Sequence, residues 1–234
     1  MLTNAEIKRI KSLKDKKFRD EYGQFAVEGE KLVDEALTSA FKVSAVYRES
    51  EVGAEVMSRM SNMSSPSPVL AVVEKPEPKP LLLERGLYLG LDSVRDPGNM
   101  GTILRLCDWF GITTLFVSMD SVDIYNPKVV QASMGSIFRV NTVFCDLPEV
   151  CKLFSEAQMP VYGTFLDGEN IYSTLTGSEG LIIMGNEASG ISPEVASKVS
   201  TRLNIPCFAK GRGPESLNVA AASAIVLSEF LRKQ

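Results

Sequence analysis

Short apolar runs alternate with helical patterns along almost the whole chain. In the N-terminal third the pattern predicts helices at about 3–19, 29–40 and 51–61, and strands at 24–28, 43–47 and 69–73. Further on it predicts strands at 87–91, 113–117, 138–144, 161–165, 181–184 and 202–205, and helices at 101–110, 127–134, 149–157 and 217–231. Strands that alternate with helices form a mostly parallel sheet covered on both faces, so the expected fold class is α/β.

The clearest boundary in this pattern is the segment 75–80, Lys-Pro-Glu-Pro-Lys-Pro. Alternating prolines can neither continue a helix nor sit in a central strand, so the segment reads as a semi-rigid linker. We therefore expect a small α/β domain at 1–74, the linker at 75–80, and a larger domain with the mostly parallel sheet at 81–234.

Cysteine and histidine usage narrows the chemistry. The chain of 234 residues has four cysteines and no histidine. This excludes Ser-His and Cys-His nucleophile pairs and the usual zinc sites, so we expect no metal. The cysteines form no Cys-x-x-Cys pair and are expected to be small buried hydrophobic residues: Cys107, Cys145, Cys151 and Cys207. Without a long apolar run or a signal-peptide pattern, we expect a cytoplasmic protein with no membrane partner.

The net charge of −4 is unevenly distributed. Residues 1–19 hold seven basic and two acidic residues, a balance of +5, which leaves 18 basic and 27 acidic residues, or −9, for the remainder. A basic stripe on an acidic body is typical of a surface that meets a phosphate backbone. The candidate RNA-binding residues in this stripe are Lys8, Arg9, Lys14, Lys16 and Lys17. The alternative is a solvated amphipathic helix with Ile7, Ile10 and Leu13 on its buried face.

Three polar clusters, 97–105, 184–190 and 215–219, each follow an apolar run and lead toward a helix. Ligands of α/β proteins bind at such loops, at the carboxyl ends of parallel strands. We therefore expect the three clusters, far apart in the chain, to converge on one site.

The first two clusters each carry a residue of interest among small neighbours. Asn99 is expected to cap the first helix, and Arg105 points off its buried stripe, although it could simply pair with Asp108. In the second cluster Glu187 is the only charge between two glycines that let the backbone approach a ligand. The alternative there is an ordinary turn that leads to Ser192 as a helix cap.

The third cluster precedes the last helix. Ser216 is expected to cap this helix, which places Asn218, a poor helix former, one residue inside its start. The helix is apolar nearly all round over 219–227, so it must be buried on more than one side, in a core or against a second subunit.

Taken together and in this order, the clusters resemble the three motifs of the SpoU (TrmH) family, in the SPOUT class of S-adenosylmethionine-dependent RNA 2′-O-ribose methyltransferases. The resemblance spans about 87–231. The stretch 25–36, Phe-Ala-Val-Glu-Gly-Glu-Lys-Leu-Val-Asp-Glu-Ala, further resembles the small substrate-binding domain of many members, which is akin to ribosomal-protein-type RNA-binding modules.

The resemblance implies a trefoil knot in the C-terminal domain and a homodimer with its active site at the subunit interface. It implies that Arg105 is the catalytic residue and that Asn99, Glu187, Ser216 and Asn218 shape the site. It implies S-adenosylmethionine as cofactor, held by Thr164, Gly185, Asn186, Ile205, Pro206 and Leu217. The loop 207–215 is longer and more basic than the family pattern, which adds Lys210 and Arg212 as candidate RNA contacts.

The predicted function is methylation of a ribose 2′-hydroxyl in structured RNA. Ribosomal RNA is favoured because of the N-terminal domain. Transfer RNA, or a catalytically inactive RNA-binding knotted protein, are the alternatives. A guanidinium with a pKa above roughly 12 gives up its proton reluctantly, so we expect Arg105 to anchor a phosphate and stabilise an oxyanion rather than act as the base.

Overall fold

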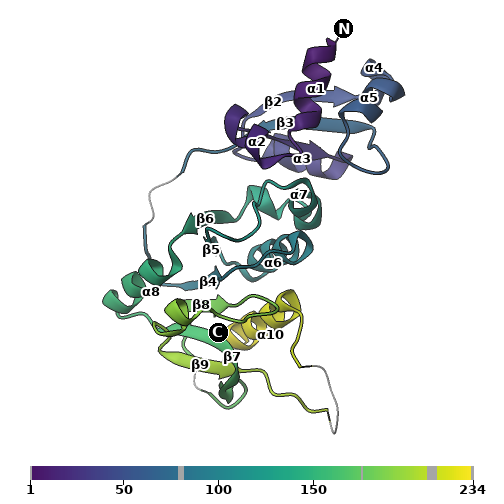
Figure 1. Ribbon diagram of the computed structural model, residues 1–234. Coiled ribbons are helices and arrows are strands. Elements are labelled where there is room, and N and C mark those ends of the chain that lie inside the picture. Colours follow the sequence, from purple (N-terminus) through teal and green to yellow (C-terminus); the bar gives the residue numbers. More distant parts are fainter. Residues whose placement is uncertain (1, 79–81, 175, 210–214, 233–234) are drawn as a thin grey trace. The chain divides into compact units, whose positions relative to one another are not determined.

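The computed structural model describes residues 2–78, 82–174, 176–209 and 215–232 (Figure 1). The chain divides into two compact units. The first consists of Met1–Lys79 together with Asp123–Arg139, and the second of Pro80–Val122 together with Val140–Gln234. No helix in the described part of the chain is long and apolar enough to cross a membrane.

The first unit is built on a three-stranded antiparallel sheet in the order β1-β3-β2. Its strands are β1 (Gln24–Glu28), β2 (Val43–Arg48) and β3 (Val69–Glu74). Its first five helices are α1 (Asn4–Ser12), α2 (Lys16–Tyr22), α3 (Glu30–Thr38), α4 (Glu49–Val52) and α5 (Ala54–Met60). The predicted apolar stripe of the first helix is buried, because Ile7, Ile10 and Leu13 pack against Met57 of α5 and Leu70 of β3.

Two of the predicted helices of this unit are interrupted. The prediction of a single helix at 3–19 is wrong, because α1 ends at Ser12 and α2 begins at Lys16. Arg19 explains the break: its guanidinium donates hydrogen bonds to the carbonyls of Leu13 (2.9 Å) and Lys14 (2.7 Å), which no longer continue a helix. The helix expected at 51–61 is likewise divided at Gly53, whose φ of +86° a helix cannot contain.

The segment Asp123–Arg139 follows β5 in the sequence but packs within the first unit. It contains α7 (Pro127–Ser133) and the short 3₁₀ helix η1 (Ser136–Phe138). Asp123 accepts hydrogen bonds from the Nε (3.0 Å) and Nη2 (2.7 Å) of Arg19, which is only 2% exposed. Tyr125 packs on Phe25 of β1, with ring centroids 4.7 Å apart. A buried ion pair and aromatic packing therefore join this segment to the N-terminal fold.

The second unit contains a six-stranded sheet in which every strand pair is parallel, in the order β6-β5-β4-β8-β7-β9. The strands are β4 (Leu87–Leu91), β5 (Thr114–Ser118), β6 (Asn141–Cys145), β7 (Val161–Asn170), β8 (Gly180–Met184) and β9 (Thr201–Asn204). The helices are α6 (Pro97–Phe110), α8 (Leu147–Glu156), α9 (Pro193–Ala196) and α10 (Val219–Leu231). The expected α/β class with a mostly parallel sheet is confirmed.

Alternate residues of the central strands pack on opposite faces of this sheet. Leu181 and Ile183 of β8 belong to a core cluster with Phe154 of α8. On the other face, Tyr162 of β7 packs edge-on against Phe230 of α10, with ring centroids 4.8 Å apart. α10 in turn packs against α6, which lies beside it in Figure 1. Helices therefore cover both faces, which explains why these strands are apolar throughout.

Candidate functional site

The three sequence clusters follow three strands of the parallel sheet. The first lies on α6, which follows β4. The second is the loop after β8, and the third leads into α10 after β9. β4 and β8 are neighbours in the sheet, and α10 packs against α6. The carboxyl ends of parallel strands share one edge of the sheet, which brings the clusters together there.

A continuous chain of hydrogen bonds joins one residue from each cluster. The Nδ2 of Asn218 donates to the Oδ1 of Asn99 at 2.8 Å. The Nδ2 of Asn99 then donates to the Oε1 of Glu187 at 2.6 Å. We call these three residues the Asn218–Asn99–Glu187 chain. Residues 119 and 88 positions apart in the sequence are thereby held in one constellation.

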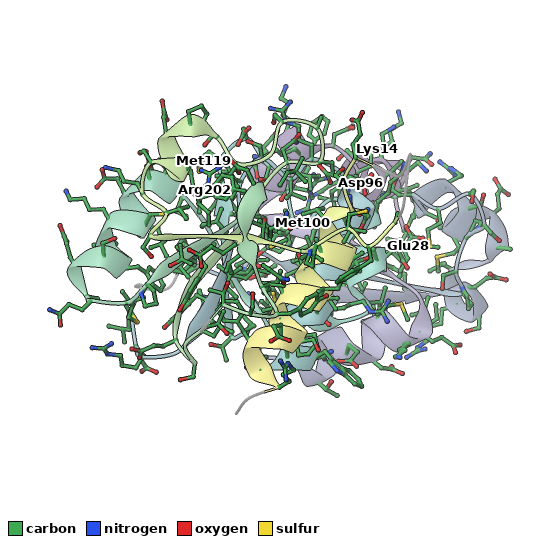
Figure 2. The ribbon with its side chains drawn as sticks, turned by 90° about the horizontal axis from the view of Figure 1, so that it is seen from below. Lys14, Glu28, Asp96, Met100, Met119 and Arg202 are labelled. Carbon is green, nitrogen blue, oxygen red and sulfur yellow. The ribbon has the colours of Figure 1, made fainter. Side chains whose placement is uncertain are left out.

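The helix caps differ from the sequence prediction in a way that explains this constellation. Asn99 was expected to cap α6, but that is wrong: Asp96, labelled in Figure 2, is the cap and accepts a hydrogen bond from the backbone N–H of Asn99 at 2.8 Å. Ser216 was expected to cap α10, but Asn218 does so, through bonds from the N–H groups of Ala220 and Ala221. The amide of Asn99 is therefore available to bridge Asn218 and Glu187.

Arg105 and Ser216 are exposed and lie outside the Asn218–Asn99–Glu187 chain. Arg105 is six residues beyond Asn99 on α6, about 9 Å along the helix axis. No hydrogen bond or ion pair joins Arg105 to another residue that the structure describes. Its guanidinium therefore keeps all its donors for an external group.

The loop after β8 is closely packed on itself. Asn186 and Gly190 exchange two backbone hydrogen bonds, both 2.9 Å long. A Cβ on Gly185 would lie 2.3 Å from the carbonyl carbon of Gly190, so only glycine fits there. The side chain of Asn186 is used within the fold: its Nδ2 donates to the carbonyl of Ser93 at 2.7 Å, and its Oδ1 accepts from Ala188 at 2.9 Å. Asn186 thus shapes the loop that carries Glu187.

The other predicted cofactor residues surround the same edge of the sheet. Thr164 of β7 is half-buried and donates to the carbonyl of Ile183 in β8 at 3.3 Å. Ile205 and Pro206 are half-buried directly after β9, and Leu217 is 47% exposed before α10. β7 lies between β8 and β9 in the sheet. Lys210 and Arg212 lie outside the described residues.

In the first unit, part of the predicted basic stripe borders a surface hollow on α1. The hollow has a volume of about 400 Å³ and is lined by Ile7, Lys8, Lys11, Ser12, Lys14, Asp15 and Arg59. Lys8 and Lys14 are exposed there. Four cations around one concavity form a positive surface that suits a phosphate group.

The remaining cations of the stripe are arranged differently. Arg9 donates to the side chain of Gln24 at 2.9 Å and lies over the ring of Tyr22. Lys16 is paired with Asp20 at 2.6 Å, whereas Lys17 is exposed. Arg19, counted in the sequence balance, is buried against Asp123 and so does not add to the surface charge. The stripe is therefore weaker than its composition indicates and is concentrated at the hollow.

The polar residues directly after β4 and β5 are not among the site residues expected from the sequence. Asp92 is 4% exposed, and Ser93 has a φ of +59°, unusual for a residue other than glycine. Hydrogen bonds from Ser93 and Ser118, together with Arg95, hold the pKa of Asp120 at about 2. The sequence feature that could have identified these polar residues is their position directly after apolar runs. The described residues hold no group of three or more acidic, cysteine or histidine side chains able to bind a metal ion.

The fold and the candidate site define a class: an α/β protein in which a closely packed, glycine-containing loop lies at the carboxyl edge of a parallel sheet, and in which the separate first unit bears a basic hollow. The chain belongs to the SpoU rRNA Methylase family, whose model matches residues 86–228. The model of the MRM3-like substrate binding domain matches residues 4–75. The resemblance drawn from the sequence motifs is confirmed.

Several relatives cover nearly the whole chain. The 23S rRNA (guanosine(2553)-2′-O)-methyltransferase RlmP of Bacillus subtilis is 31% identical over an alignment of 240 positions that covers 96% of this chain and 95% of the relative. A solved TrmH-family structure from Porphyromonas gingivalis has a TM-score of 0.88 and 39% identity, with full coverage of both chains. The AdoMet-bound rRNA methyltransferase of Sinorhizobium meliloti has a TM-score of 0.87 and 29% identity, over 100% of this chain and 96% of that one.

Proposed function

We propose that this protein transfers the methyl group of S-adenosylmethionine to a ribose 2′-hydroxyl of ribosomal RNA. The observation that carries the proposal is the Asn218–Asn99–Glu187 chain, which draws the three family motifs to one edge of the parallel sheet. The names of the relatives support the substrate: RlmP acts on 23S rRNA, and the Sinorhizobium meliloti protein is an rRNA methyltransferase with bound AdoMet.

The residues at this edge fit such a cofactor. Gly185 is required by the close approach of Gly190, so at this point the loop after β8 would offer an adenine backbone groups rather than a side chain. Half-exposed Leu217 and half-buried Ile205 offer apolar contact to its faces. The exposed carboxylate of Glu187 would supply a counter-charge for a sulfonium. We assign cofactor binding to these residues together with Thr164 and Pro206, and give Asn186 the task of shaping the loop.

The chain's own residues orient the reaction and stabilise charge. When bound, the cofactor supplies a methyl group already activated by its sulfonium, so no metal is needed. The nucleophile is the substrate's 2′-oxygen, which must lose its proton as it reacts. Asn99, fixed by two hydrogen bonds, holds Glu187 in a single orientation. Arg105, free of internal partners among the described residues, anchors a substrate phosphate and stabilises the developing oxyanion, while that phosphate or water takes the proton.

We assign the remaining parts of the molecule from family membership and the charge distribution. Residues 1–74 form the RNA-binding domain, 75–80 the linker and 81–234 the methyltransferase domain, except that Asp123–Arg139 pack within the first unit. Lys8 and Lys14 at the hollow contact RNA phosphate directly, with Arg9, Lys16 and Lys17 around them, and Lys210 and Arg212 add a contact from the loop 207–215. Ser216 lines the active site.

We also propose that the methyltransferase domain is knotted and works as a cytoplasmic homodimer. Trp109, 84% exposed on α6, supports the dimer, because so large an apolar side chain is seldom left in water.

The test is methyl transfer from labelled S-adenosylmethionine to ribosomal RNA fragments, with 2′-O-methyl positions mapped afterwards. We expect Arg105→Lys to lower kcat at least about 100-fold, because an ammonium cannot bind phosphate bidentately while stabilising an oxyanion. Cofactor affinity, measured by calorimetry, stays unchanged. A lysine variant that kept most of its turnover would contradict the role of Arg105. Label found on a base rather than a ribose would contradict the proposed reaction.

A further inference from the structure

Asp92 joins the two ends of the loop that carries Glu187. This loop begins after Met184, the last residue of β8, and ends at Ser192 before α9. The backbone N–H of Asp92 donates to the carbonyl of Met184 at 2.9 Å. The Oδ2 of Asp92 accepts a hydrogen bond from the backbone N–H of Ser192 at 2.7 Å. One residue at the end of β4 therefore fixes both ends of the loop 185–191.

Ser93 fixes the interior of the same loop. Its carbonyl accepts a hydrogen bond from the Nδ2 of Asn186 at 2.7 Å. Its own backbone N–H donates to the Oγ of Ser118 at 2.8 Å, and its hydroxyl donates to Asp120 at 2.6 Å. Ser93 is held in the left-handed region, with φ +59°, a conformation that persists only where surrounding contacts determine it.

The carboxylate of Asp92 is suited to this position. It is 4% exposed, and a buried charge costs free energy unless it is hydrogen-bonded. A charged acceptor also forms a stronger hydrogen bond to a backbone N–H than a neutral one does. The side chain of Ser192 makes no capping bond to α9. Its contact with Asp92 is made by the backbone N–H.

We propose that Asp92 is a positioning residue for methyl transfer: it holds the loop 185–191 so that the backbone of Gly185 and the carboxylate of Glu187 meet the cofactor in one arrangement. The inference rests on the proposed function. Asp92 acts through the loop and does not itself touch substrate or cofactor.

Three variants of the full chain isolate this role. Asp92→Ala removes the acceptor, and Asp92→Asn keeps an oxygen that can accept from Ser192. Ser192→Pro removes the donor at a φ of −60°, which proline adopts, and leaves the buried Asp92 carboxylate without this bond and against the proline ring. Asp146→Ala is the matched control. Asp146 caps α8 in the same unit by accepting from the N–H of Glu149, and it makes no hydrogen bond to the loop.

Two measurements distinguish positioning from general stability. Hydrogen exchange reports the protection of amides 185–192, and calorimetry gives the Kd for S-adenosylmethionine. We expect Asp92→Ala and Ser192→Pro to lose amide protection in the loop and to raise the Kd about 10- to 100-fold, the range that corresponds to losing a hydrogen bond to a charged group. Asp92→Asn should restore the Kd to within about threefold of wild type. Asp146→Ala should lower thermal stability and leave the Kd unchanged.

Each contrary result is distinct. Lost loop protection with an unchanged Kd would show that Asp92 orders the loop without serving the cofactor, and would overturn the proposal. So would an equal rise in Kd for Asp92→Ala and Asp146→Ala. If Asp92→Ala does not fold, Asp92→Leu, which removes the acceptor but keeps most of the side-chain volume, decides between the same outcomes. A wild-type protein that binds no S-adenosylmethionine would instead refute the proposed function, while hydrogen exchange would still report whether Asp92 orders the loop.

Discussion

The four cysteines differ in burial, and their thiols therefore differ in reactivity. Burial raises the pKa of the Cys107 and Cys151 thiols to about 12 and that of Cys145 to about 11, because a low-dielectric interior disfavours the thiolate. Cys207 is exposed, so its sequence-based assignment as a buried residue is wrong. Its neighbour Phe208 is exposed as well, and apolar composition alone could not reveal that this stretch lies at the surface.

We expect iodoacetamide at pH 8 to alkylate only Cys207 in the native protein. The thiolate is the nucleophile, and at this pH a thiol with a pKa near 12 is ionised about one part in 10,000. Peptide mass spectrometry after a short exposure measures the labelling. All four cysteines should react in denaturant, which serves as the control. Rapid native labelling of Cys151 would contradict the burial described here.

The residues of the site could be chosen from the sequence, but two of their structural roles could not. Asp96 and Asn99 are both good helix caps, and so are Ser216 and Asn218, so local preference leaves two starts open for each helix. In the structure Pro97 follows Asp96 at the start of α6, where its fixed φ suits a helix, and Asn218 accepts the N–H groups of Ala220 and Ala221 at the start of α10. Asp92 was missed because its partners, Met184 and Ser192, are distant in the chain and the contact is to backbone.

Among the secondary-structure elements, α10 depends on a residue that also belongs to the site. Asn218 caps the helix with its Oδ1 and holds Asn99 with its Nδ2. Aspartate caps helices as well as asparagine does but has no amide donor. The two tasks of this side chain can therefore be separated by substitution.

We expect Asn218→Asp to keep the thermal stability of wild type and to lose activity at least about tenfold, because the hydrogen bond to Asn99 is lost. Asn218→Ala should lose the same activity and also about 1 kcal/mol of stability, or roughly 2–4 °C in Tm. Scanning calorimetry and the methyl-transfer assay give the two quantities. An aspartate variant with full activity would show that the link to Asn99 is dispensable.

The elements that the sequence predicted incorrectly were altered by distant contacts. The break between α1 and α2 depends on Arg19, whose carboxylate partner Asp123 is 104 residues away. The strand expected at 138–144 begins only at Asn141, because η1 occupies 136–138. By contrast, the central strands β4, β5 and β8 followed from apolar runs alone, since nearly all their residues are buried.

At the scale of the whole molecule, the net charge of −4 does not reveal that the hollow on α1 is a basic surface. The hollow on α1 gathers Lys8 and Lys14, whereas Arg9 and Lys16 are engaged with neighbours in the same unit. A chain with a negative net charge can therefore still bind RNA at this hollow. The slope of log K against log salt measures how many RNA phosphates are contacted there.

We expect Lys8→Ala with Lys14→Ala to weaken RNA binding and to reduce the slope of log K against log salt by about 1.4–1.8, as for two lost phosphate contacts. Cofactor affinity should stay unchanged. The double substitution of Arg9 and Lys16 by alanine is the charge-matched control and should have the smaller effect. Filter binding of ribosomal RNA fragments from 50 to 200 mM salt measures both. Equal slopes for wild type and the Lys8 Lys14 variant would remove the hollow from the RNA surface.

The return of Asp123–Arg139 to the first unit has a practical consequence for dissecting the protein. A truncation at the proline-rich segment would take Arg19 and Phe25 away and leave Asp123 and Tyr125 behind, stripped of their ion-pair and aromatic partners. In such a fragment the apolar residues of α7 that are buried in the first unit would be exposed to water, and we therefore expect it to aggregate. Excision that respects the fold must remove both stretches of polypeptide and rejoin Val122 to Val140.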